Sequence, residues 1–189
     1  MSPNLVLTPL AHVLKAALFA ADRHRNQRRK GQRGAPYVNH PLAVAECLAT
    51  AGIEDPDILA AALLHDTVED TDTSLSELDD SFGPRVASIV AEVTDDTSLP
   101  TVERKSRQIL SAPTKSYEAK LVKLADKICN LRDLRDCPPD WTTERIDTYY
   151  RFARDVYQGL RGAHAALDHQ MDHLLTQHAQ AGDKLCTFD

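Results

Sequence analysis

The chain has 189 residues and a net charge of −6, from 22 Lys and Arg against 28 Asp and Glu, and 42% of its residues are hydrophobic. This length fits one domain of about 100–200 residues and allows a full core without disulfides or a structural metal. The balance of charge and hydrophobic residues excludes a basic nucleic-acid-binding protein and a disordered chain.

Helix signals recur along the first half of the chain, whereas strand signals are almost absent. Residue pairs with proline in second place predict helix starts at Thr8-Pro9, His40-Pro41, Asp55-Pro56 and Gly83-Pro84. Ser74 with Glu77 fits a capping box for a short helix. The apolar positions after Pro56 continue to Val68, so the helix that starts there is expected to include residues 65–70.

The second half predicts a basic helix over about 102–110 and a long helix over about 116–134, whose apolar residues keep a three/four spacing. A break at 137–140 precedes two more helices, over about 143–160 and 162–180. The predicted fold is therefore a single all-α domain over residues 1–189 with about eight or nine helices. Its core is expected to span about 8–178, followed by a C-terminal tail over about 179–189.

Cysteine usage and hydropathy bear on the compartment. None of the four cysteines forms a C-x-x-C pair, so a reducing cytosol is the default. Apolar runs fall far short of the about 20 residues that a membrane span requires, and residues 1–9 show no secretory signal. We expect a cytoplasmic protein without a membrane or nucleic-acid partner, and the sequence leaves assembly into a homo-oligomer open.

The charges are unevenly distributed along the chain. Residues 23–33, the basic segment, hold six cationic residues and no acidic one. Residues 66–80, the acidic segment, hold seven acidic residues and no basic one. The chain is bipolar, and a functional hypothesis has to account for both segments.

The most informative stretch is residues 65–70, HDTVED. On a helix, His65 lies above Glu69 and Asp66 above Asp70, so the four side chains form adjacent stacks on one side. One imidazole and three carboxylates so close together are costly unless a cation or water meets them. The simpler alternative is a solvated acidic face, but the stretch directly follows the apolar run 59–64, which places at least its first residues near the core.

Two distant residues strengthen the metal hypothesis. His40 stands at a predicted helix start, and Asp126 stands inside an apolar helix, where an unpaired charge is expensive. Two imidazoles with two carboxylates suit a divalent transition ion such as Mn, Fe or Zn better than Mg. The alternatives are a helix-capping His40 and a salt bridge from Asp126 to Lys123 or Lys127.

The order H…HD…D on a helical chain resembles the HD-domain metal-dependent phosphohydrolases. Longer segments are similar to the small alarmone hydrolases, which are relatives of the hydrolase domain of the RelA/SpoT proteins. The similarity runs from about residue 16 to 175. The segments that carry it are His24–Lys30 (HRNQRRK), Pro36–Pro41 (PYVNHP), Ala62–Asp72 (ALLHDTVEDTD), Glu92–Asp96 (EVTDD) and Lys120–Leu134 (KLVKLADKICNLRDL).

The resemblance implies a reaction and a set of catalytic residues. The implied reaction is hydrolysis of the 3′-pyrophosphate of guanosine tetraphosphate or pentaphosphate (ppGpp or pppGpp) to GDP or GTP and pyrophosphate. Glu69 and Asp70 are implied to position or activate the attacking water. One Mn²⁺ per chain is implied, and its ligands are His40, His65, Asp66 and Asp126.

The resemblance also gives the basic segment a role in binding a guanine nucleotide, where a solvated helix end or a general patch for anionic partners is otherwise the simpler interpretation. The implied nucleotide contacts are Arg29, which stacks on guanine, together with Lys30, Asn130, Arg145 and Tyr149. The chain departs from some relatives at Thr101, where they carry Lys within LPKxERK. If that Lys contacts the distal phosphates, Arg104 or Lys105 replaces it here, or affinity falls.

Two other functions stay open. An HD site supplies general phosphoester chemistry, so the substrate could be another nucleotide, such as a phosphorylated dinucleotide. The chain could also be a metal-bearing, nucleotide-binding module without turnover, although ligation alone does not require Glu69 and Asp70. A further metal site at His169 and His173, four residues apart, is less favoured than a solvated helix face.

Overall fold

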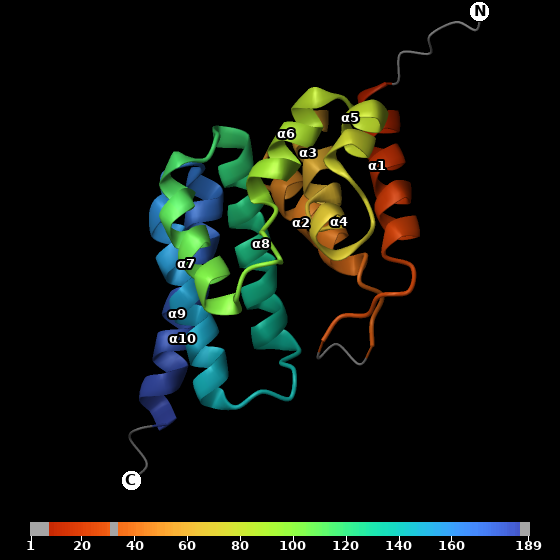
Figure 1. Ribbon diagram of the computed structural model, residues 1–189. Coiled ribbons are helices and arrows are strands. Elements are labelled where there is room, and N and C mark those ends of the chain that lie inside the picture. The colour runs from red at the N-terminus through yellow and green to blue at the C-terminus, as the bar shows by residue number, and fades with distance from the viewer. Residues whose placement is uncertain (1–7, 31–33, 186–189) are drawn as a thin grey trace, which may run out of the picture.

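The computed structural model describes residues 8–30 and 34–185, with side chains up to residue 181, and the prediction of an all-α fold is confirmed (Figure 1). The predictions on residues 1–7, Gly31, Arg33 and Cys186 lie outside the described residues. The helices are α1 (Pro9–Arg23), α2 (Asn39–Thr50), α3 (Pro56–Leu64), α4 (Thr67–Asp70), α5 (Leu75–Phe82), α6 (Pro84–Val93), α7 (Thr101–Ser111), the 3₁₀ helix η1 (Ala112–Thr114), α8 (Tyr117–Asp136), α9 (Thr143–Leu160) and α10 (Ala165–Leu185).

Most helix starts lie where the capping signals predict them. The side chains of Thr8, Asp55 and Ser74 accept hydrogen bonds from backbone N–H groups in the first turns of α1, α3 and α5. Such caps each contribute about 1 kcal/mol. Gly83 joins α5 to α6 with φ at 90°, a left-handed conformation that favours glycine. Local signals therefore position several of the segments that later converge on the site.

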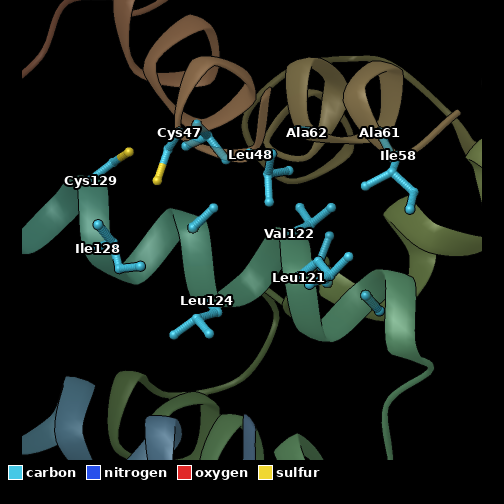
Figure 2. Close-up of a cluster of buried hydrophobic side chains, with 14 of the residues drawn as sticks. Cys47, Leu48, Ile58, Ala61, Ala62, Leu121, Val122, Leu124, Ile128 and Cys129 are labelled. Atoms are coloured by element: carbon cyan, nitrogen blue, oxygen red, sulfur yellow. The ribbon is translucent and has the colours of Figure 1, made fainter. Parts of the chain in front are cut away.

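Helix α8 is the centre of the molecule. It contacts α2, α3 and α6 on one side and α9 and α10 on the other, and Figure 1 shows it between these two groups. Because α8 is enclosed, its buried residues lie all around its axis rather than on one stripe. Figure 2 shows Leu121 and Val122 of α8 near Leu48 of α2 and Ile58 of α3 in this core. Within the described ranges, no helix has the length and apolar character needed to cross a membrane.

The expectation of one helix from Pro56 through residues 65–70 is wrong. Helix α3 ends at Leu64, and α4 begins at Thr67. The His65 Nδ1–H group donates to the Ala62 carbonyl at 2.8 Å, and the Thr67 hydroxyl donates to the Leu64 carbonyl at 2.7 Å. These side chains occupy carbonyl groups at the end of α3, so residues 65 and 66 form a corner instead of another helical turn.

Because α8 is central, we expect the stability of the fold to depend on its buried side chains. Leu124 of α8 is fully buried, so Leu124→Ala removes packing contacts and leaves a cavity in the core. We expect the free energy of unfolding to fall by about 2–5 kcal/mol in urea titrations. Leu110→Ala on α7 is the control, because Leu110 is 76% exposed and its truncation is expected to change little. Equal losses in the two variants would contradict the central role of α8.

Candidate metal centre

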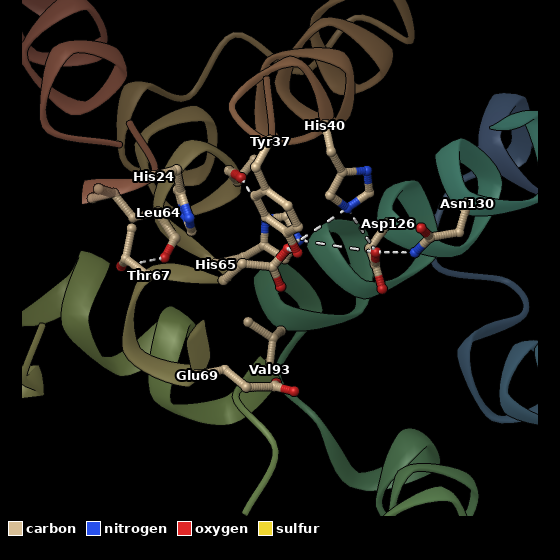
Figure 3. Close-up of polar contacts among 12 residues, drawn as sticks. His24, Tyr37, His40, Leu64, His65, Thr67, Glu69, Val93, Asp126 and Asn130 are labelled. Carbon is tan, nitrogen blue, oxygen red and sulfur yellow. Dashed lines mark hydrogen bonds and ion pairs between the residues drawn. The ribbon is translucent and has the colours of Figure 1, made fainter. Parts of the chain in front are cut away.

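Three segments that are distant in sequence bring together His40, His65 and Asp126. His40 lies in the first turn of α2, His65 at the corner between α3 and α4, and Asp126 in the middle of α8. One ligand atom from each lies within 4.8 Å of the others, and all three residues are buried. His40 Nε2 is 3.2 Å and His65 Nε2 is 3.9 Å from Asp126 Oδ1 (Figure 3). Three of the four predicted ligands thus face one point.

Asp66 borders the same point. Its Oδ2 atom lies 3.2 Å from His65 Nε2 and 3.8 Å from His40 Nε2. The same oxygen accepts a hydrogen bond from the Tyr37 hydroxyl at 2.7 Å. This bond orients the carboxylate, as partners behind metal ligands commonly do.

The donor atoms fit a divalent cation. Because the Nδ1–H of His65 is donated to a backbone carbonyl, Nε2 carries the free lone pair of the neutral ring. This Nε2 is buried, has no hydrogen-bond partner among the described residues, and faces two carboxylates. Imidazole nitrogen with carboxylate oxygen is a donor set for transition ions such as Mn, Fe or Zn.

The titration behaviour of the cluster supports this fit. Burial disfavours protonation of His65, but the carboxylates of Asp66 and Asp126 outweigh it and raise the pKa of His65 to about 9. Burial opposes ionisation of Asp126, yet Lys127 and His40 hold the pKa of this carboxyl well below its usual range. The cluster thus favours a positive charge at its centre, which a proton or a metal ion can supply.

The alternative explanations for His40 and Asp126 fare differently. His40 lies within α2, and no side chain caps that helix, so the capping role is wrong. Lys127 Nζ does lie 3.3 Å from Asp126 Oδ2, whereas Lys123 Nζ donates to the Val93 carbonyl. The ion pair uses one oxygen of Asp126, while Oδ1 faces the imidazoles.

Glu69 and Asp70 of α4 lie beside the cluster, and burial raises the pKa of both carboxyl groups. Glu69 accepts a hydrogen bond from the Asp95 N–H at 3.1 Å, and its other oxygen lies 3.5 Å from a guanidinium nitrogen of Arg104. These contacts fix the orientation of Glu69. A carboxylate whose pKa is shifted toward neutrality is better matched to general base catalysis.

A pocket of about 440 Å³ opens next to the cluster, with Asp70 in its wall. Of the predicted nucleotide contacts, Arg29, Lys30, Asn130 and Tyr149 line it. Arg145 does not line this pocket, but its guanidinium carbon lies 4.1 Å from the ring centre of Trp141, which does. The structure therefore gathers these five residues from the loop before α2 and from α8 and α9.

The pocket also contains residues that the sequence did not indicate. Arg29 forms an ion pair with Asp133 and a 3.1 Å hydrogen bond to Asn130 Oδ1, and its guanidinium lies over Tyr37. Trp141 supplies an aromatic wall. The available signals were that Trp141 is the only tryptophan and that Tyr37 and Asp133 lie inside the quoted motifs.

The C-terminal histidines do not add a metal site. His169 and His173 are exposed on α10. His178 Nε2 lies 2.8 Å from Asp147 Oδ1 and is thus occupied by a hydrogen bond. In residues 8–30 and 34–181, the one group with metal-ligand spacing is the cluster of His40, His65 and Asp126.

Comparison with known proteins places this geometry in context. A family model described as "HD domain" matches residues 16–165. The chain is 52% identical to human guanosine-3′,5′-bis(diphosphate) 3′-pyrophosphohydrolase MESH1 over 169 residues, covering 88% of this chain and 94% of the human protein. The zebrafish (Danio rerio) protein of the same name is 50% identical, with the same two coverages.

A solved structure agrees with these relatives. It belongs to a metazoan orthologue of SpoT that is described as hydrolysing ppGpp and acting in starvation responses. It superposes on this chain with a TM-score of 0.87 and 46% sequence identity, over 91% of this chain and 98% of that one.

Because the cluster exists only in the folded chain, we expect a divalent metal that binds there to stabilise the fold. After dialysis against EDTA, MnCl₂ at 100 times its Kd is expected to raise the free energy of unfolding by about 2.7 kcal/mol, seen as a higher melting temperature. His40→Ala is expected to abolish the increase, whereas His173→Ala, at an exposed imidazole, keeps it. A normal response in His40→Ala would remove His40 from the ligand set.

Metal affinity is expected to depend on pH. Because His65 holds a proton below about pH 9 in the metal-free cluster, a metal ion has to displace that proton. Calorimetric titration with MnCl₂ is expected to show affinity falling by about tenfold per pH unit below this value for the one proton released. Affinity that stays constant between pH 8 and 6 would contradict the proton-competition argument.

Proposed function

Because the chain belongs to the HD-domain family and matches its ppGpp-hydrolysing members over nearly its whole length, we propose that it is a guanosine-3′,5′-bis(diphosphate) 3′-pyrophosphohydrolase. It converts ppGpp or pppGpp and water to GDP or GTP and pyrophosphate. The observation that carries the proposal is the His-Asp cluster beside a pocket of nucleotide size with cations in its wall. The metal cluster alone is compatible with hydrolysis of many phosphoesters, and the adjacent pocket restricts the substrate.

We propose one Mn²⁺ per chain, held by His40, His65, Asp66 and Asp126. The support is the mixed nitrogen and oxygen donor set and the partnerless Nε2 of His65. Such an ion, when bound, polarises a phosphoryl oxygen and lowers the pKa of water. The Tyr37 hydroxyl keeps Asp66 in place, and the amide of Asn130 donates to Asp126 Oδ1 at 2.5 Å.

Glu69 and Asp70 are proposed to handle the attacking water. Asp70 lines the pocket one helical turn after Asp66, and its carboxylate can accept a proton from water as the oxygen attacks the phosphorus next to the ribose 3′ oxygen. Glu69 is held by the Asp95 N–H and orients the water. The bond from that phosphorus to the 3′ oxygen breaks, the 3′ oxygen takes up a proton, and pyrophosphate leaves.

The basic segment is proposed to bind the nucleotide. Arg29 is braced by Asp133 and by the ring of Tyr37, which keeps its planar guanidinium ready to stack on guanine. Lys30, Asn130, Arg145 and Tyr149 are proposed as the remaining contacts with base, sugar and phosphate. The positive charges of Arg29, Lys30 and Arg145 offset the carboxylates that otherwise repel a polyanionic substrate.

We further propose a single domain in a cytoplasmic setting. Helix α10 packs on α8 and α9, so the C-terminal part shares the core of the rest. The three cysteines within the described residues, Cys47, Cys129 and Cys137, are free thiols, as is usual in a reducing compartment.

The direct test offers ppGpp, pppGpp, a 3′-phosphorylated dinucleotide and GTP to the Mn-loaded protein, with products separated by ion-exchange chromatography. GDP and pyrophosphate from ppGpp support the proposal. Turnover of the dinucleotide alone would identify a different phosphohydrolase. Tight binding of ppGpp without products would identify a binding module.

A matched variant tests the roles of the two carboxylates. Glu69→Gln with Asp70→Asn removes both water-handling charges while preserving side-chain size. We expect kcat to fall by at least about 100-fold, the usual size of a general base contribution. The Mn-induced rise in melting temperature is expected to persist, because neither residue is a proposed ligand. Activity within a few fold of the parent chain would refute this mechanism.

A further inference from the structure

A pair of cysteines lies where α2 packs on α8, apart from the metal cluster and from the walls of the nucleotide pocket. Cys47 of α2 and Cys129 of α8 are both free thiols, and both are buried. Figure 2 shows their sulfur atoms in the space between the two helices, and the two thiols share a hydrogen bond. The fold thus brings two sulfur atoms together across a helix–helix interface.

The surroundings make the two thiols unequal. The hydrogen bond from Cys129 lowers the pKa of Cys47 against the opposing effect of burial, and the guanidinium of Arg132 lowers it further. The same hydrogen bond, together with burial, raises the pKa of Cys129. Cys47 is therefore the sulfur with thiolate character, and Cys129 keeps its proton. A thiolate in contact with a second thiol is the arrangement of an attacking and a resolving cysteine.

The pair is buried, but it lies next to side chains that reach the surface. The Cys47 thiol donates to Gln170 Oε1 at 3.5 Å, and the guanidinium of Arg132 donates to the same oxygen at 2.8 Å. Both Gln170, on α10, and Arg132, on α8, are only half-buried. Rotation of the Gln170 side chain therefore gives a molecule as small as hydrogen peroxide a path to the Cys47 sulfur.

We propose that Cys47 and Cys129 form a reversible disulfide when the chain meets hydrogen peroxide, and that this bond braces the junction of α2 and α8. The Cys47 sulfur attacks one peroxide oxygen. A sulfur–oxygen bond forms, the oxygen–oxygen bond breaks, and the second oxygen leaves as water with the thiol proton, so that Cys47 becomes a sulfenic acid.

The second step uses Cys129. Its sulfur attacks the Cys47 sulfur, the disulfide bond forms, the sulfur–oxygen bond breaks, and the hydroxyl group leaves as water with the Cys129 proton. Overall, two thiols give up two electrons and two protons to one peroxide molecule, and the products are one disulfide and two water molecules. A thiol reductant reverses the change by exchange.

The disulfide joins the two helices that carry proposed metal ligands. His40 lies about two turns before Cys47 on α2, and Asp126 lies about one turn before Cys129 on α8. The bond also closes a long loop of chain, and closing a long loop restricts the unfolded state most strongly. Oxidation is therefore expected to stabilise the fold while leaving the ligand side chains unmodified.

The test exposes the full-length chain to hydrogen peroxide in a buffer with EDTA, which keeps peroxide from reacting at bound metal. Remaining thiols are alkylated, and the chain is digested with trypsin for mass spectrometry. The fragment over residues 128–132, which holds Cys129, is expected to be linked to the fragment that holds Cys47. The melting temperature is expected to rise by about 5 °C or more, and dithiothreitol is expected to reverse both changes.

Three variants serve as controls. Cys137→Ala removes an exposed thiol and is expected to leave both the linked fragments and the rise in melting temperature unchanged. Cys47→Ala and Cys129→Ala, made separately, are each expected to abolish both. Absence of the linked fragments from the oxidised parent chain would overturn the disulfide, and a linked chain without a higher melting temperature would overturn the bracing. Because no measurement uses ppGpp, the outcome is independent of the proposed function.

Discussion

The buried carboxylate of Asp126 is the constraint on which the site depends. It lies in the middle of the central helix, where an isolated charge costs several kcal/mol even after the protein relaxes. Four polar neighbours stabilise this charge. They are His40 on α2, His65 at the α3–α4 corner, and Lys127 and Asn130 on α8 itself. Because these groups belong to segments distant in sequence, satisfying one charge fixes how α2, α3 and α8 meet.

The two charged segments join through the same arrangement. Arg23 pairs with Glu77, which ties the end of α1 to α5, and Gln27 donates to the backbone carbonyl of Asp70. The residues of the acidic segment therefore occupy different environments. Asp66, Glu69 and Asp70 face the cluster, Glu77 holds the basic segment, and Asp79 and Asp80 are exposed. A net charge of −6 counts the cluster without the cation it favours, and it therefore overstates the negative field that a nucleotide meets.

The helix starts were predictable because caps are local, and Asp126 was predictable as a member of a polar cluster because a charge in an apolar helix requires a partner. The corner at His65 and Asp66 was not, because it depends on which side chains take the carbonyl groups of α3. The contacts of Tyr37 and Asp133 also escaped prediction, because each depends on a neighbour far away in sequence. Spacing within one segment thus predicts candidate groups, whereas only tertiary packing selects among them.

Helix α7 shows how one short element can contact two separate parts of the fold. Successive residues on a helix point about 100° apart, so Arg104 and Lys105 face different neighbours. Arg104 lies against Glu69 of α4, and Lys105 lies over Phe152 of α9. One helix therefore contacts both the Glu69 carboxylate beside the metal cluster and the buried ring of Phe152. Because α7 packs on α9, the position of Arg104 beside Glu69 depends on how these two helices meet.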